Sequence, residues 1–443
     1  MLGEYRIAGR RAAEIAESVE RGIGAGELAP GQPLPPLREL AQGLGVNPNT
    51  VAAAYRTLRD RGVIETAGRR GSRVRARPSS TSRGSIRVDA PAGVREVSDG
   101  NPDPALLPPL HDAFAVAARE HAERPGRYGD AAVLPELARL ARAGLDEDGV
   151  PDGPVAVTSG SLDAIERVLA AHLRPGDAVA VEDPGWGSLL DLVPALGLRP
   201  LPMALDDDGP LPGGMERALR AGARAVVVTD RAQNPTGAVV GAARARELRT
   251  VLAVHPHVLL IEDDHGHRIV DVPLHPLAGV TDSWALVRST AKAYGPDLRL
   301  AVLTGDTVTV DRVTGRQRLG PGWVSRLLQR AVVELWSTDA VDPRQVARAY
   351  GERRDALVAA LAERGVEAHG RSGMNVWVPV AEETGAVARL LHAGWAVAPG
   401  ARFRLSAGPG VRLTVSGLTP DDIEAVADAV AGAAGAAPAR SYG

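Results

Sequence analysis

Six short apolar runs alternate with helical stretches between residues 155 and 304, and this alternation constrains the fold more than any other feature of the chain. The runs occupy residues 155–158, 178–181, 225–229, 258–261, 285–288 and 301–304. Hydrophobic strands connected by helices form parallel sheets, because each helix returns the chain across a face of the sheet. The alternation therefore predicts an α/β domain built on a mostly parallel sheet.

A different rhythm begins near residue 340. Helical stretches rich in Arg and Ala precede the apolar runs 374–380 and 412–416, and a last helix starts at Pro420. This order predicts a smaller α+β unit beside the sheet. We expect a body of residues 98–437, with a large part at about 128–335 and a small part at about 98–125 plus 340–437.

A head precedes this body and is separated from it by a segment rich in Ser, Pro and Gly. Residues 78–97 have that composition and little periodicity, which is typical of a linker. The head, residues 1–77, carries 13 Arg against 8 acidic residues, whereas the whole chain has a net charge of −3. A basic head on an acidic body indicates a polyanionic partner for the head.

The head has the pattern of three short helices followed by a basic hairpin. Apolar residues recur at helical spacing over 12–23, a second helix follows, and Asn47 with Pro48 starts a third. Residues 63–74 predict a two-stranded hairpin, so the order is that of a winged helix-turn-helix whose third helix enters the major groove. We expect three hairpin arginines to contact phosphates or the minor groove: Arg69, Arg70 and Arg73.

The head also resembles the GntR family of bacterial regulators. The resemblance rests on residues 26–31 (Gly-Glu-Leu-Ala-Pro-Gly), 35–41 (Pro-Pro-Leu-Arg-Glu-Leu-Ala) and 46–51 (Val-Asn-Pro-Asn-Thr-Val). It departs from the family where Asn47-Pro48 replaces the usual Ser-Arg. The resemblance implies that three residues face operator DNA: Arg38, Asn49 and Thr50. A winged helix that serves only protein contacts is the alternative.

Composition excludes several classes of protein. The chain has no Cys, which excludes disulfides, thiolate metal sites and cysteine nucleophiles. Its apolar runs fall far short of the roughly 20 residues that a membrane span requires. The N-terminus has no apolar signal region. We therefore expect a cytoplasmic protein without a membrane partner.

A single lysine stands out among the basic residues. The chain has 50 Arg and one Lys, Lys292, so arginine serves wherever any cation suffices and the retained amine is a candidate for chemistry that needs one. Lys292 follows a predicted strand, with Ser289 three residues before it and Arg299 seven residues after it. An imine-forming lysine beside groups that can bind a phosphate points to pyridoxal phosphate, PLP.

The other roles of a PLP site have candidates in the chain. A carboxylate that keeps the pyridine nitrogen protonated follows the strand at 258–261; strand alternation allows Asp263 or Asp264, and we prefer Asp263. Backbone N–H groups at a helix start after the strand at 155–158 suit the phosphate. The remaining candidates are Asn234 for the phenolate oxygen, Trp186 for the ring face and Arg412 for a ligand carboxylate.

This order of residues resembles the fold type I aminotransferases across residues 98–437. The resemblance implies that Lys292 forms the internal aldimine, that Asp263 pairs with the pyridine nitrogen and that the protein is a homodimer. Two positions depart from the family: His265 replaces a Tyr that donates a hydrogen bond to the phenolate oxygen, and Leu162 replaces a Gln. The implied cofactor-binding residues are Ser159, Gly160, Ser161, Trp186, Asn234, Asp263, His265, Ser289, Lys292, Arg299 and, from the partner subunit, Tyr128.

A GntR-type head on such a body resembles the MocR subgroup of bacterial regulators. It implies a PLP-dependent transcriptional regulator that senses an amino compound or a vitamin B6 vitamer through an aldimine at Lys292. A functional aminotransferase with a secondary DNA-binding head is one alternative, and a body that has lost PLP and serves as a scaffold is another.

A metal site is the competing interpretation of one cluster in the body. Four residues have metal-ligand side chains at close spacing: Asp263, Asp264, His265 and His267. The PLP candidates that surround this cluster favour the cofactor, and we expect no metal.

Overall fold

The computed structural model describes most of the chain, and the account below is limited to that part. The described residues are 5–24, 27–29, 31–60, 63–66, 71–74, 83, 86 and 90–434. The chain divides into two compact units, of which the first contains Met1–Ser82 and the second most of Arg83–Gly443. Arg69 and Arg70, which the sequence assigns to DNA binding, lie outside the described residues.

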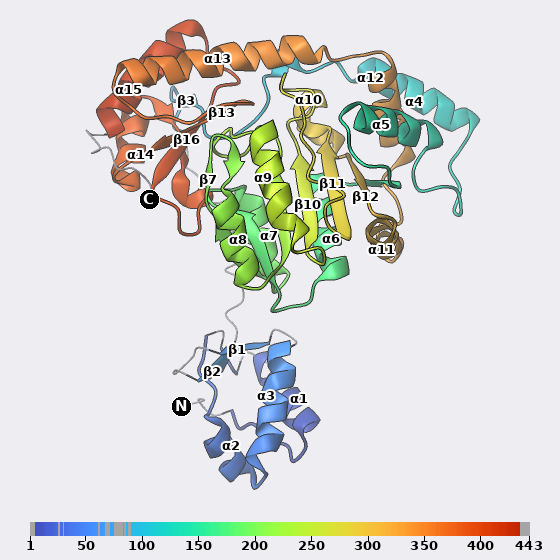
Figure 1. Ribbon diagram of the computed structural model, residues 1–443, viewed down its shortest axis with the longest axis vertical. Coiled ribbons are helices and arrows are strands. Elements are labelled where there is room, and N and C mark those ends of the chain that lie inside the picture. The colour runs from blue at the N-terminus through green and yellow to red at the C-terminus, as the bar shows by residue number, and fades with distance from the viewer. Residues whose placement is uncertain are drawn as a thin grey trace. The chain divides into compact units, whose positions relative to one another are not determined.

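The first unit is the winged helix that the sequence predicts (Figure 1). Its helices are α1 (Ala12–Gly24), α2 (Leu37–Leu44) and α3 (Pro48–Asp60), and its hairpin is β1 (Ile64–Thr66) with β2 (Ser72–Val74). The Asn47 side chain accepts a hydrogen bond of 2.9 Å from the Asn49 N–H, which caps α3. The unit has its own apolar core, which includes Ile15, Val19, Leu28, Val51, Tyr55 and Leu58.

The second unit is built on a seven-stranded sheet in the order β4-β12-β11-β10-β9-β5-β6. Neighbours from β5 to β11 pair in parallel, and only β12 among the described pairings of this sheet runs antiparallel to its neighbours. The fold class that the alternation predicts is therefore confirmed. The strands are β4 (Val155–Thr158), β5 (Ala178–Glu182), β6 (Arg199–Met203), β9 (Ala223–Thr229), β10 (Leu259–Asp264), β11 (Ser283–Ser289) and β12 (Ala301–Gly305).

The sequence misses one strand of this sheet and ends another too early. β6 contains Pro200 and Pro202, which suppress a strand prediction, but the strand lies at the edge of the sheet, where a missing N–H donor is tolerated. β10 continues three residues past the apolar run, through Glu262, Asp263 and Asp264, and all three are buried. Three consecutive acids inside a sheet contradict the hydrophobic pattern, and they mark the site described below.

Helices cover the sheet on both faces (Figure 1). α8 packs on α9, α6 on α11, and α12 on both α4 and α5. The helices are α4 (His111–Glu123), α5 (Pro135–Glu147), α6 (Ser161–His172), α7 (Gly187–Ala195), α8 (Pro212–Arg220), α9 (Ala242–Ala253), α10 (Ala291–Tyr294), α11 (Thr307–Arg318) and α12 (Arg326–Ser337). Short elements are β7 (Leu205–Asp206), β8 (Gly209–Pro210) and the 3-10 turns Pro104–Leu106, Pro296–Leu298 and Gly400–Arg402.

The small part is a three-stranded antiparallel sheet, β13-β16-β15, with helices packed against it. α13 and α14 both pack on α15. Its elements are α13 (Pro343–Glu363), β13 (Asn375–Pro379), α14 (Glu383–His392), β14 (Trp395–Ala396), β15 (Ala398–Pro399), β16 (Gly410–Thr414) and α15 (Pro420–Ala434). No helix in the described part of the chain is long and apolar enough to cross a membrane.

Two predicted boundaries differ from the structure. Strand β3 (Arg95–Glu96), inside the predicted linker, pairs in parallel with β14, and the sequence hides it because both residues are charged and exposed. Helix α4, which the sequence groups with the small part, packs on α12 instead. The apolar stripe of α4 predicts that the helix is buried on one face but not which element covers that face.

Candidate functional site

Most of the residues that the sequence assigns to a cofactor meet at the carboxyl ends of the parallel strands. A cavity of about 330 Å³ lies there. Open α/β sheets bind their ligands at this edge, because the loops that leave the strands diverge and the connecting helices begin there. Its lining includes Gly160, Ser161, Leu162, Trp186, Asn234, Asp263, His265, Ser289, Lys292 and Arg299.

Lys292 lies on the short helix α10, next to the end of β11. Its ammonium donates a hydrogen bond of 2.6 Å to the backbone oxygen of Gly100. Burial, together with the charge of Arg412, lowers the pKa of Lys292 to about 8. A substantial fraction of the side chain is therefore a neutral amine near physiological pH, and a neutral amine is the form that attacks an aldehyde.

Asp263 and Asp264 face opposite sides of β10. Asp263 lines the cavity, and its Oδ1 has no hydrogen-bond partner among the described residues although the side chain is buried. Asp264 instead pairs with Arg231 at 2.7 Å and with Arg288 at 3.0 Å. Although burial opposes the effect, these two guanidinium groups hold the pKa of Asp264 well below its ordinary value. Asp263 is thus the carboxylate that a ligand in the cavity meets.

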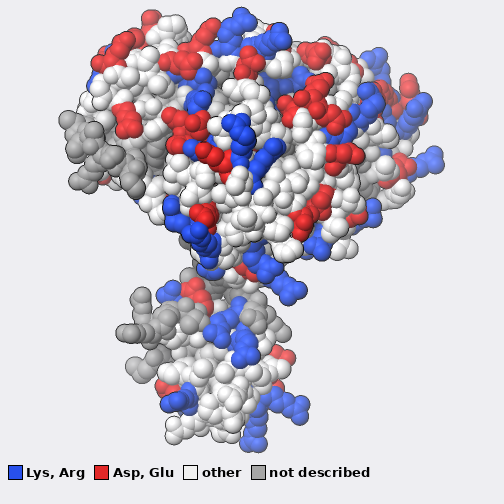
Figure 2. Space-filling model, viewed as in Figure 1, with Lys and Arg blue, Asp and Glu red and all other residues white. Residues whose placement is uncertain are grey.

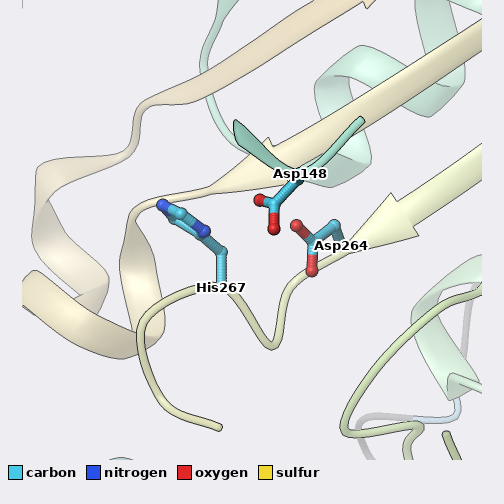
Figure 3. A group of neighbouring side chains, drawn as sticks. All are labelled: Asp148, Asp264 and His267. Carbon is cyan, nitrogen blue, oxygen red and sulfur yellow. The ribbon is translucent and has the colours of Figure 1, made fainter. Parts of the chain in front are cut away.

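Asp264 belongs to a separate cluster with Asp148 and His267 (Figure 3). Their ligand atoms lie within 4.8 Å of one another, a spacing that a metal ion can bridge. Arg288, however, bonds both Asp148, at 2.5 Å, and Asp264. A cation placed here would meet the charges of Arg288 and Arg231 at close range, and repulsion between like charges opposes its binding. The cluster is an ion-pair network that fixes β10 to the end of α5.

The start of α6 and Arg299 form the end of the cavity where the sequence predicts a phosphate. Gly160 has φ +98°, and a Cβ at this position would lie 2.8 Å from Nη2 of Arg299. Only glycine therefore lets the guanidinium approach the helix N-terminus, where N–H groups and the helix dipole favour an anion. The hydroxyl of Ser161 is buried and has no partner among the described residues. Ser159 is exposed and outside the cavity lining, and its N–H donates to Asp163.

His265 makes two contacts that bear on its predicted role. Its Nδ1 lies 3.3 Å from Oδ2 of Asp263, and its Nε2 lies 2.7 Å from the oxygen of Ala232. Burial lowers the pKa of His265, but the hydrogen bond and the charge of Asp263 outweigh burial and raise it above its ordinary value. Both ring nitrogens are engaged, so donation to a cofactor oxygen requires that one contact be exchanged.

A second cavity of about 130 Å³ adjoins the first and shares Trp186, Asn234, His265 and Lys292 with it. Arg412 lines this second cavity and is almost completely buried. Its Nη1 donates to Oδ1 of Asn234 at 3.0 Å, and its guanidinium lies 4.8 Å from the centre of the Phe403 ring. Burial, together with the charge of Arg402, lowers the pKa of Arg412 to about 9. Asp99 and Glu96 oppose this shift in pKa without outweighing it, and a ligand carboxylate would give Arg412 a direct ion pair.

Sequence reasoning misses several residues that line these cavities. Gly100 holds Lys292 through a backbone carbonyl, which no side-chain pattern reveals. Arg402 lines the second cavity but is one of 50 arginines, so composition does not single it out. Phe403 is one of only two phenylalanines in the chain, and that rarity is the one signal that was available.

Tyr128 lies outside both cavities of the single chain. Its side chain is 93% exposed, and its ring meets the edge of Trp323 with centroids 5.6 Å apart. The expectation that Tyr128 reaches the phosphate of a partner subunit stays a prediction.

The residues that the sequence predicts to face DNA belong to the first unit. Arg side chains lie on the face of this unit that Figure 2 shows. Arg38 and Asn49 are exposed and Thr50 is partly buried, at the start of α2 and α3 respectively. Arg73 on β2 pairs with Glu65 on β1 at 2.5 Å, so binding a phosphate requires Arg73 to exchange or share that partner.

The fold and the larger cavity together define a class of protein, the fold type I PLP-dependent proteins. The residues present fit that cofactor: an amine of lowered pKa, a buried carboxylate oxygen without a partner in the described chain and an anion site at a helix start face one space. When bound, PLP supplies an aldehyde and an electron-withdrawing ring.

Comparison with known proteins gives the family. The family model "Aminotransferase class I and II" matches residues 97–430, and "Bacterial regulatory proteins, gntR family" matches residues 11–74. The chain therefore belongs to the MocR subgroup of GntR-family regulators, and its cofactor is pyridoxal phosphate.

Individual relatives agree with this assignment. The vitamin B6 salvage pathway transcriptional repressor PtsJ of Salmonella typhimurium is 40% identical over 95% of this chain and 98% of its own length. The "Probable rhizopine catabolism regulatory protein MocR" of Rhizobium meliloti is 26% identical over 78% of this chain and 76% of its own. Aspartate aminotransferase from Thermus thermophilus with maleate has a TM-score of 0.67 at 25% identity, covering 77% of this chain and 92% of that one.

Proposed function

We propose that this regulator binds operator DNA through its first unit, as a homodimer, and senses the cell's supply of vitamin B6. The signal is a B6 vitamer that bonds to Lys292, or an amino compound that reacts with PLP held there. The observation that carries the proposal is Lys292 itself: the only lysine of a DNA-binding chain lies in the cavity with its pKa lowered to about 8. A regulator that acts on chromosomal DNA belongs in the cytoplasm.

Each residue has a defined task in this proposal. Lys292 would hold the cofactor through its neutral amine, and the cofactor would supply the aldehyde to which that amine can bond. Asp263 would pair with the pyridine nitrogen, Trp186 would lie against the ring, and the start of α6 with Arg299 would hold the phosphate. The vitamer shifts the regulator between two states because these contacts differ in strength between the two.

The vitamin B6 signal is proposed for a reason beyond the site. The relative that matches this chain along nearly its whole length is named as a repressor of vitamin B6 salvage. His265 favours sensing over turnover, because both of its ring nitrogens are engaged and the donor expected for the cofactor oxygen is occupied.

The homodimer is proposed from the exposed loop that carries Tyr128. Tyr128 is 93% exposed and Leu319, on the chain segment that leads to Trp323, is 89% exposed, so two large apolar side chains face solvent. Apolar surface of this kind is typical of protein interfaces. A dimer also presents two winged helices to two operator half-sites.

A functional aminotransferase is the second candidate, and Arg412 favours it. A buried guanidinium in the cavity next to Lys292 is suited to hold the carboxylate of an amino acid beside the reacting amine.

The experiment is a visible absorbance titration of the cofactor-free protein with PLP, paired with operator binding by fluorescence anisotropy. Wild type is expected to develop a visible band and to change its operator affinity over the same PLP range. Lys292→Ala is expected to form no such band and to keep one operator affinity throughout. An unchanged response in Lys292→Ala overturns the proposal. Continuous release of keto acid on adding amino acids establishes the aminotransferase instead.

A further inference from the structure

Arg83 is the first residue of the second unit, and it is bonded at several points to the body. Its backbone N–H donates to Oδ2 of Asp191 at 2.6 Å, and its Nε lies 3.3 Å from Oδ1 of the same carboxylate. Its Nη1 donates to the backbone oxygens of Ala401 at 3.0 Å and Arg404 at 2.9 Å. The side chain is only 25% exposed, so these bonds are shielded from competing water.

Asp191, the first bonding partner of Arg83, is connected to the larger cavity through α7. Asp191 lies on α7, one helical turn after Gly187, and Gly187 directly follows Trp186. Trp186 lines both cavities. A rigid helix of nine residues thus connects the residue that covers the cofactor ring to the carboxylate that holds Arg83.

The other partners of Arg83, two backbone carbonyls of the small part, are connected to the second cavity. The two carbonyls that Arg83 binds bracket Arg402 and Phe403, and both of these side chains line the second cavity. Phe403 also lies under the guanidinium of Arg412. We call residues 400–407 the cavity loop, because Arg402 and Phe403 line the second cavity while the carbonyls of Ala401 and Arg404 hold Arg83.

The cavity loop is fixed to the large part at other points as well. The N–H of Gly185 donates to the oxygen of Phe403 at 2.7 Å. Asp183 accepts hydrogen bonds from the backbone of Leu405, Ser406 and Ala407, at 2.7–2.9 Å. The large part and the small part therefore meet along this loop. Arg83 spans the junction, with Asp191 on one side and the two loop carbonyls on the other.

We propose that Arg83 is the positioning residue that couples the cavities to the linker. A guanidinium holds its donors in a fixed plane, so Arg83 keeps Asp191 and the two loop carbonyls together only at one separation of α7 and the cavity loop. A ligand that contacts Trp186, Arg402 or Arg412 changes that separation and releases or secures Arg83. Because Arg83 directly follows Ser82, where the N-terminal segment of the first unit ends, the change reaches the chain segment that carries the DNA-binding head.

This inference rests on the proposed function, since it needs PLP to change operator affinity. It predicts a coupling that is separable from ligand binding. Arg83 lines neither cavity, so its loss is expected to leave PLP affinity within about twofold of wild type while removing the effect of PLP on DNA binding.

The test compares operator affinity with and without PLP in Arg83→Ala, Arg83→Lys and Asp191→Asn, with Arg316→Ala as the matched control. Arg316 is an exposed arginine on α11, so Arg316→Ala removes the same charge at another place on the second unit. Wild type and Arg316→Ala are expected to show an affinity ratio of about fivefold or more. In Arg83→Ala the ratio is expected to fall below about twofold. The ratio is expected to fall in the same way in Arg83→Lys, because one ammonium cannot bind both Asp191 and the two loop carbonyls.

The effect of operator DNA on PLP affinity is a second measurement, and a purely structural role of Arg83 would not change it. If PLP and operator DNA are coupled, saturating operator must change the PLP affinity of wild type by the same factor. Arg83→Ala and Asp191→Asn are expected to lose this reciprocal change while keeping the visible band and the thermal midpoint.

The outcomes separate the two proposals. A wild-type ratio of one overturns the proposed function and this inference with it. A normal wild-type ratio that persists in both Arg83→Ala and Asp191→Asn overturns only the assignment of Arg83. A ratio lost in those two variants and kept in Arg316→Ala establishes it.

Discussion

At the scale of single residues, Lys292 makes a prediction about pH. Its amine reacts in the neutral form, and its pKa is lowered to about 8 by burial and by Arg412. The rate of PLP attachment is therefore expected to rise about tenfold per pH unit below pH 8 and to level off above it. Stopped-flow absorbance from pH 6 to 10 measures this. A rate that climbs steadily to pH 10 contradicts a lowered pKa.

Arg412 provides the control for that profile. Replacing Arg412 by Gln removes a positive charge beside Lys292, so the plateau is expected to begin at higher pH.

Asp264 makes a second prediction, about stability. Its carboxylate is fully buried between Arg231 and Arg288, so Asp264→Asn leaves two buried guanidinium groups short of charge. Breaking a buried pair in this way costs about 3–5 kcal/mol of unfolding free energy. Urea unfolding of the cofactor-free protein measures the loss.

Asp206→Asn is the matched control for Asp264→Asn. Asp206 also pairs with an arginine, Arg244, but its side chain is 47% exposed, so the expected loss is about 1 kcal/mol or less. Equal losses in the two variants would show that burial does not set the strength of the Asp264 pairs.

At the scale of elements, carboxylates buried at strand ends set a pH dependence. Burial raises the pKa of Glu182, at the end of β5, to about 7, and the pKa of Glu262 on β10 likewise. The unfolded chain loses these protons near pH 4.5 and the folded chain near pH 7, so stability is greatest below pH 4.5 with respect to these groups and falls as pH rises to 7.

Glu182→Gln isolates one of these contributions. The side chain accepts hydrogen bonds from Thr229 and Gln233, and the amide keeps its shape without the charge. Between pH 5 and 7 the unfolding free energy of wild type is expected to fall more steeply than that of Glu182→Gln, by up to roughly 1 kcal/mol per pH unit. Parallel slopes in urea unfolding would assign the pH dependence to other groups.

Elements and site residues differ in how well the sequence predicts them. The helices of the head and the central strands follow from apolar spacing, because burial of one face imposes that spacing. β6 does not, because Pro200 and Pro202 break the pattern and the edge position that permits them is a property of the assembled sheet. Lys292 is found from rarity and Asp263 from its place after a strand. The bond from Lys292 to Gly100 and the cavity loop arise from backbone brought together over long sequence distances, which no local pattern encodes.

At the scale of the whole molecule, the two units are expected to divide the work. Each has its own apolar core, which predicts that a chain starting at residue 78 retains the PLP band and loses operator binding. Absorbance and anisotropy on the truncated protein measure both. Retained operator binding would mean that DNA recognition lies outside the head.

Because Lys292 is the only lysine, a protease can detect whether a cofactor is attached to it. An endopeptidase specific for lysine has one cleavage site in the denatured chain and yields fragments of 292 and 151 residues. If Lys292 holds the cofactor, borohydride reduction before denaturation converts that site into a secondary amine that the protease does not recognise. The fraction of uncut chain on a gel then gives the fraction of the regulator in a cell that carried its vitamer at the moment of reduction.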